Sequence, residues 1–127
     1  MYKLALIAVG SAAGGLCRYG LAGVVQRFAG VTFPWGTLCV NVVGCLLIGV
    51  CGAVFSGPHL IREEYRLAAT VGLLGGFTTF SSFGFETLQL VNSGSMRSAI
   101  LNVSACNVLG LGAAWIGYRL VERWLGA

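Results

Sequence analysis

Four strongly polar side chains lie inside long apolar runs of the sequence: Arg18, Asn41, Glu86 and Asn102. A charged group at the centre of a membrane helix costs about 2.5–3.5 kcal/mol on insertion scales. Side chains of this kind line ion pathways, or they bond one another across helices. The residue types therefore predict ion binding or transport, with helix-to-helix bonding as the alternative. For the two charged residues, we expect Arg18 and Glu86 to pair and Arg18 to lend positive potential to a vestibule.

The third apolar run contains the segment Gly75 to Phe83, GGFTTFSSF, which is a poor helix former. Adjacent glycines and adjacent threonines both weaken a helix. Backbone that leaves the helix at membrane depth is tolerated only where protein or a cavity surrounds it, and its free carbonyls can coordinate a cation such as Na⁺. The segment predicts a broken helix near the bilayer centre, and a kink packed by small residues is the alternative.

Aromatic rings and hydroxyls follow this predicted break. Phe80 and Phe83 share one helix face, and Ser81 and Ser82 lie between them. A ring edge is positively polarised, so an anion can pass along ring edges and hydroxyls without being trapped by a full charge. On the second run, Thr37 lies one turn before Asn41 on the same face and extends the polar stripe.

The composition excludes most protein classes. Of 127 residues, 57% are hydrophobic, 9% are charged and 20 are glycine, and soluble domains carry about 25% charged residues. The net charge of +4 comes from scattered residues rather than a basic stripe, which excludes a nucleic-acid module. The sequence contains no Asp and no nucleophile–base pattern, so we expect no enzyme. Five cysteines show neither disulfide nor zinc spacing, and we assign no metal role to His59.

The apolar runs fit a single four-span membrane domain over residues 1–127, an all-α protein whose third helix is broken. The spans are predicted at about 4–25, 35–56, 67–91 and 98–118. Counted from the run ends, the four polar residues share one layer roughly 6–10 Å below the surface opposite the termini. Because this layer occupies one half of the protomer, an inverted second copy would complete a polar crossing, whereas a parallel copy would not.

The chain resembles a known family, the small bacterial Fluc/CrcB fluoride channels. The resemblance covers nearly the whole length and is carried by WGTLCVN at Trp35 to Asn41 and by GGFTTFSSF followed by Glu86. It implies a multi-pass protein of the bacterial inner membrane, an antiparallel dual-topology homodimer with two fluoride pathways, and passive export of cytoplasmic fluoride.

The resemblance also implies roles for individual residues. The carbonyls of Gly75 and Thr78 in each protomer would hold a central structural Na⁺. The fluoride pathway would use the rings of Phe80 and Phe83, the Asn41 amide and the hydroxyls of Thr37, Ser81 and Ser82, with Arg18 as the first-span arginine. Asn102 departs from the family pattern, which often has tyrosine nearby.

Two other functions remain open from the residues. A small four-span proton-coupled multidrug transporter needs a membrane carboxylate that substrate can reach, and Glu86 is the candidate. A non-transporting assembly protein is the third possibility, and the intramembrane polar layer disfavours it. For Asn102, Ser104 and Asn107 on the fourth span, we expect at least one to bond a neighbouring helix, because the three cannot share one narrow face.

Overall fold

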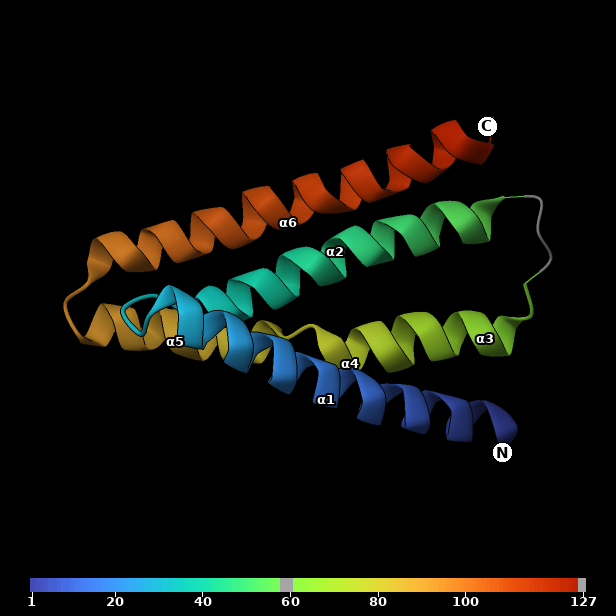
Figure 1. Cartoon of the computed structure of the whole chain (residues 1–127), viewed down its shortest axis with the longest axis horizontal. Helices are drawn as coiled ribbons and strands as arrows, with labels where there is room; N and C mark the ends of the chain where they lie inside the picture. Colours follow the sequence, from blue (N-terminus) through green and yellow to red (C-terminus); the bar gives the residue numbers. More distant parts are fainter. Residues whose placement is uncertain (58–60, 126–127) are drawn as a thin grey trace.

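The computed structural model describes residues 1–57 and 61–125, and every regular element in these ranges is helical (Figure 1). Four of the helical stretches are long and apolar enough to cross a membrane. The elements are α1 (Tyr2–Ala29), α2 (Trp35–Ser56), α3 (Glu63–Leu67), the π-helix η1 (Ala68–Leu74), α4 (Gly75–Phe77), α5 (Phe80–Asn92) and α6 (Met96–Leu125). The predicted all-α architecture is confirmed, with α3 to α5 forming the third stretch.

The helices extend beyond the apolar runs from which the spans were predicted. The third stretch begins at Glu63 rather than residue 67, and α6 continues past residue 118 to Leu125. Charged side chains support the extra turn of α6, where Arg119 Nη1 lies 2.5 Å from Glu122 Oε2. Hydropathy marks where apolar residues stop, whereas helical hydrogen bonding continues into the polar turns beyond them. His59, to which no metal role was assigned, lies outside the described residues.

The third stretch is interrupted at Thr78 and Thr79. Both residues are extended, with ψ values of 158° and 112°, and α5 begins immediately afterwards. The break falls inside the segment 75–83, as its glycines and threonines predict. The π-helix η1, which the sequence pattern did not predict, precedes it.

Glycines bring the helix backbones into direct contact. A Cβ added to Gly14 of α1 would overlap the Leu73 carbonyl of η1, and one added to Gly117 of α6 would overlap the Leu46 carbonyl of α2. Such close approach is how membrane helices associate without a hydrophobic driving force between them. The glycines thus hold α1 against η1 and α6 against α2.

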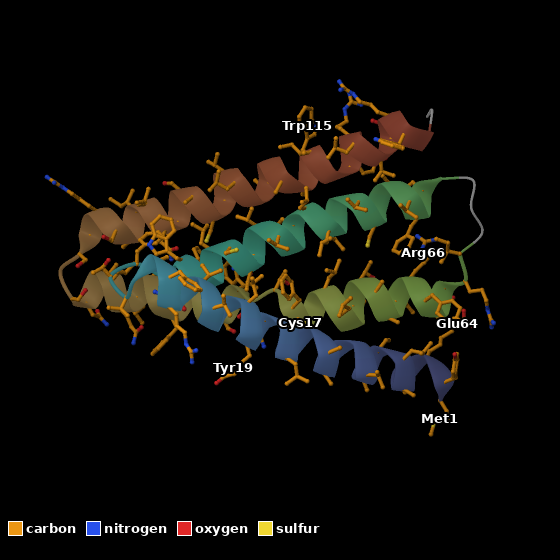
Figure 2. All side chains as sticks on the ribbon, viewed as in Figure 1. Met1, Cys17, Tyr19, Glu64, Arg66 and Trp115 are labelled. Atoms are coloured by element: carbon orange, nitrogen blue, oxygen red, sulfur yellow. The ribbon has the colours of Figure 1, made fainter. Side chains whose placement is uncertain are left out.

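The loops divide the bundle into two distinct ends. The first helix begins and the last helix ends at the same end, and the α1–α2 and α5–α6 connections lie together at the other (Figure 1). Large side chains such as Tyr19 and Trp115 point away from the bundle (Figure 2). This outward apolar surface suits a lipid environment.

Candidate functional site

The break in the third stretch is held by one side chain of α2. The Asn41 amide Nδ2 donates to the Thr79 carbonyl at 3.0 Å, and the Thr79 N–H donates to Asn41 Oδ1 at 2.8 Å. Both backbone groups of an extended residue are therefore satisfied by a single amide. Asn41 thus stabilises the break directly, in addition to lining the groove described below.

Three hydroxyls gather where α5 begins. Thr79 caps the helix, because its Oγ1 accepts from the Ser82 N–H at 3.1 Å. The same atom lies 3.0 Å from the Ser82 hydroxyl and 3.2 Å from that of Ser81. The backbone N–H groups of Phe80 and Ser81 have no partner among the residues that the structure describes. The start of α5 therefore offers uncharged donors at the positive end of a helix dipole.

Arg18 and Glu86 do not form the ion pair that we expected. Arg18 Nη1 donates instead to the Thr78 carbonyl at 3.4 Å. Glu86 Oε1 accepts from the Thr37 hydroxyl at 2.7 Å, and its Oε2 is buried without a partner in the described part of the chain. Both charged residues line one cavity of about 370 Å³, which Thr79 and Ser82 also line. Their opposite charges thus share a space without direct contact.

The rings of Phe80 and Phe83 form a tilted pair at the start of α5. Their centroids are 5.4 Å apart and their planes meet at 48°. Phe83 is packed inside the protomer, whereas Phe80 is 84% exposed. Both line a groove of about 350 Å³ together with Asn41 and Thr79. One ring is thus fixed within the protomer and the other is presented at its surface.

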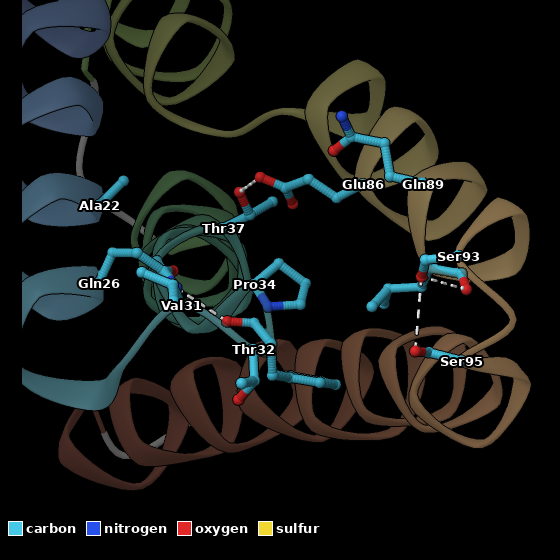
Figure 3. A pocket seen from close by; sticks show the side chains of 13 residues that line it. Ala22, Gln26, Val31, Thr32, Pro34, Thr37, Glu86, Gln89, Ser93 and Ser95 are labelled. Carbon is cyan, nitrogen blue, oxygen red and sulfur yellow. Dashed lines mark hydrogen bonds between the residues drawn. The ribbon is translucent and has the colours of Figure 1, made fainter.

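A wider cavity of about 630 Å³ opens at the end of the bundle that carries the α1–α2 loop (Figure 3). Gln26 holds that loop in place, because its Nε2 donates to the Phe33 carbonyl at 2.9 Å and its Oε1 accepts from the Gly36 N–H at 3.0 Å. Figure 3 shows the Thr37–Glu86 hydrogen bond among the residues that line this cavity. The mouth is therefore a structured polar vestibule.

The three spaces follow one another through shared residues. The end cavity and the Arg18 cavity are both lined by Ala22, Thr37 and Glu86. The Arg18 cavity and the phenylalanine groove are both lined by Thr79. The three spaces therefore adjoin one another between one end of the protomer and the break in the third stretch.

The carbonyl oxygens at the break are the type of ligand that a hard monovalent cation such as Na⁺ prefers. The Thr79 N–H, which would bond the Gly75 carbonyl in a continuous helix, is bonded to Asn41, and both Gly75 and Thr78 line the groove. Within residues 1–57 and 61–125, no cluster of three or more His, Cys, Asp or Glu side chains could hold a metal. Two carbonyls from one chain do not enclose an ion, so a second copy is needed to complete such a site.

Sequence reasoning missed two residues that organise this region. The Thr79 hydroxyl is the hub of the hydroxyl cluster, and its position three residues before Ser82 is a helix N-cap signal. Gln26 has no comparable signal, because its partners lie in an irregular loop. The expectation for the fourth span is confirmed, since Asn102 bonds Thr87 of α5 whereas Asn107 bonds only the Val103 carbonyl of its own helix.

A family model described as "CrcB-like protein, Camphor Resistance (CrcB)" matches residues 5–118 of the chain. The chain belongs to the CrcB family. The match spans all four apolar helices and includes the broken stretch with its phenylalanines, hydroxyls and carbonyls. With those four helices and bacterial relatives, this CrcB-family chain is a multi-pass bacterial membrane protein.

Curated relatives match over nearly their whole lengths. A protein of Geobacter sulfurreducens is 48% identical over 97% of this chain and 99% of its own. A protein of Thermus thermophilus is 46% identical over 99% of this chain and 100% of its own. A protein of Methylobacillus flagellatus is 39% identical over the full length of both chains. All three are named fluoride-specific ion channel FluC.

The Asn41 bonds predict a large effect on stability. Asn41→Leu leaves the N–H and the carbonyl of Thr79 without partners, and each unsatisfied buried group costs about 1–3 kcal/mol. We therefore expect the free energy of unfolding to fall by about 2–5 kcal/mol, measured by reversible denaturation in mixed micelles. The control is Asn107→Leu, whose amide bonds only its own helix and which should cost about 1 kcal/mol or less. Equal losses in the two variants would contradict the assigned role of Asn41.

Proposed function

We propose that this CrcB-family chain forms a passive channel that exports fluoride from the cytoplasm. The observation that carries the proposal is the set of relatives named fluoride-specific ion channel, which match over nearly the whole chain. The geometry supports it, because adjoining cavities with polar linings lie between the bundle end and the break, and the phenylalanine groove lies beside them. No step of such a process requires enzymatic chemistry.

The pathway that we propose offers an anion many weak partners. The hydroxyls of Ser81 and Ser82 and the free N–H groups at the start of α5 are donors, and Arg18 lines the adjoining cavity. Beyond them the edges of Phe80 and Phe83 carry partial positive charge. Conduction needs binding that is weak enough for release, and neutral donors in series meet that requirement.

An inverted second copy would complete this pathway. Phe80 is 84% exposed in one protomer, although the rest of its groove is formed. The end cavity and the Arg18 cavity lie between one bundle end and the break in the third stretch, that is, in one half of the protomer. We propose that an antiparallel homodimer supplies the second half and generates two pathways related by a two-fold axis.

The same pairing would bring two breaks together. The carbonyls of Gly75 and Thr78 from two copies provide four oxygens, which suits a structural Na⁺ on the two-fold axis. The hydrogen bond from Arg18 to the Thr78 carbonyl ties the first helix to this point. We propose that the ion holds the two breaks in place and takes no part in transport.

A proton-coupled multidrug transporter is the less favoured function. It needs a carboxylate that exchanges protons and meets a cationic substrate. Here Thr37 donates to one oxygen of Glu86, and Arg18 lines the same cavity. Glu86 is thus already engaged by a neighbouring hydroxyl, and the relatives' names do not describe such transporters.

Liposomes that contain the purified protein and are loaded with fluoride should release it rapidly through the proposed channel. Chloride-loaded liposomes are the control and should release little, because chloride is larger and forms weaker hydrogen bonds with hydroxyl and N–H donors. A fluoride electrode measures both. Well-folded protein that releases no fluoride would refute the function.

The structural Na⁺ is tested in the same assay by replacing sodium with a bulky cation on both sides of the membrane. The fluoride flux should fall if Na⁺ is structural, and unchanged flux would contradict the proposed Na⁺ site.

The ring pair provides a second test. Phe80→Ile and Phe83→Ile keep apolar volume but remove the ring edges, and aromatic edge contacts are worth about 0.5–1.5 kcal/mol. We expect each to lower the fluoride flux about two- to tenfold without dissociating the dimer. Phe85→Ile is the control, because Phe85 is exposed on the same helix outside the groove, and it should leave the flux unchanged. Normal flux in both ring variants would contradict a role for the rings.

The inverted arrangement is tested by labelling. A variant with the native cysteines replaced by alanine and Ser93→Cys in the α5–α6 turn carries one thiol at a single bundle end. In sealed vesicles, an impermeant maleimide should label one protomer of each crosslinked pair, and permeabilisation should expose the other. Crosslinked pairs that are labelled twice or not at all would show a parallel dimer.

A further inference from the structure

Asn102 is the most deeply buried polar side chain in the described part of the chain. It lies on α6, and only 1% of its surface is exposed. Its Nδ2 donates to the Thr87 hydroxyl of α5 at 2.9 Å, and its Oδ1 lies 3.8 Å from the Cys106 thiol one turn along α6. Burial of an amide is unfavourable unless both its ends are bonded, and here both ends have partners.

These contacts form a hydrogen-bond chain with a single direction. The Thr87 hydroxyl donates its proton to the Phe83 carbonyl at 2.7 Å, so it can only accept from Asn102. The thiol of Cys106 donates to the amide oxygen, which fixes the amide against a flip. The chain therefore runs from Cys106 through Asn102 and Thr87 to the backbone of Phe83. Bonds aligned in this way strengthen one another.

The hydrogen bond from Asn102 to Thr87 is the one side-chain hydrogen bond between α5 and α6 among the described residues. Two side-chain hydrogen bonds from α2 also hold this part of the structure, because Asn41 bonds Thr79, the residue that caps α5, and Thr37 bonds Glu86 within α5. Thr87 lies one turn after Phe83 on the same face of α5. Anchors from α2 and α6 on different faces of a short helix fix its rotation about its own axis, which anchors on one face alone do not.

We propose that Asn102 is a positioning residue that sets the rotation of α5 and thereby the place of the Phe83 ring in the groove. The proposal rests on the fluoride function proposed above and gives a positioning role to Asn102, for which the sequence predicts a place in the polar layer and a candidate bond to a neighbouring helix. Phe83 is packed against the protomer and forms the fixed half of the ring pair. A small rotation of α5 would change the angle between its ring and that of Phe80.

The test compares two substitutions at Thr87. Thr87→Val keeps the shape and removes the hydroxyl, whereas Thr87→Ser keeps the hydroxyl that links Asn102 to Phe83. Thr87→Val and Asn102→Leu should each lower the fluoride flux about tenfold, and the double variant should lose no more than either one. Thr87→Ser should restore the flux. Ser56→Ala is the control, because it removes a hydroxyl bonded to its own helix at the far end of α2.

Flux is measured at low protein density, where each active liposome holds one channel. Positioning predicts slower release from an unchanged fraction of active liposomes. A purely structural role predicts fewer active liposomes that release at the normal rate, and that result would overturn the proposal. Equal flux in Thr87→Val and Thr87→Ser would overturn it as well.

Hydrogen exchange over residues 80–92 gives a readout that does not depend on fluoride. The amides of α5 should exchange faster in Thr87→Val and Asn102→Leu than in Thr87→Ser. If the unsubstituted protein releases no fluoride, the channel function fails while the exchange data still decide whether Asn102 holds α5. Unchanged exchange in all variants would contradict the anchor itself.

Discussion

The fold depends on the requirement that backbone polar groups inside a bilayer find partners within the protein. A helix broken at Thr78 and Thr79 exposes such groups at the depth where water is least available. The Asn41 side-chain amide forms hydrogen bonds with both the N–H and the carbonyl of Thr79. Once that bond is in place, the second half of the stretch can begin as a separate helix with its own N-terminus, and the hydroxyls that follow acquire a fixed location.

Each of the other three helices contributes a polar side chain that bonds the broken stretch. Arg18 of α1 reaches the Thr78 carbonyl, Thr37 of α2 reaches Glu86, and Asn102 of α6 reaches Thr87. In lipid, such bonds fix the rotation of each helix about its own axis, because apolar helix surfaces alone pack almost equally well in several rotations. The residues that make the region polar are thus largely those that hold it together, whereas the N–H groups of Phe80 and Ser81 have no partner among the described residues.

Sequence reasoning predicted the helices and which residues share a helix face, but it did not predict the hydrogen-bond partners of Arg18 and Gln26. Hydropathy and the glycine–threonine segment predict the membrane helices and the break, because both follow from local chemistry. Counting residues from the span ends placed Arg18 and Glu86 at one depth and suggested an ion pair. In the structure, Arg18 bonds the Thr78 carbonyl instead, which is free to accept only because the helix is broken. Gln26 shows the same limit, since its partners lie in a loop whose path no periodicity describes.

The π-helix η1 has a consequence for how this protein can change in length. A π-helical turn holds about one residue more than an α-helical turn, and Ala68–Leu74 therefore stores an insertion upstream of the break. Deleting one residue there would therefore return the segment to α-helix and leave the residues from Gly75 onward in register. A one-residue deletion within α5 has no such segment to absorb it, and it would turn the rest of that helix by about 100°.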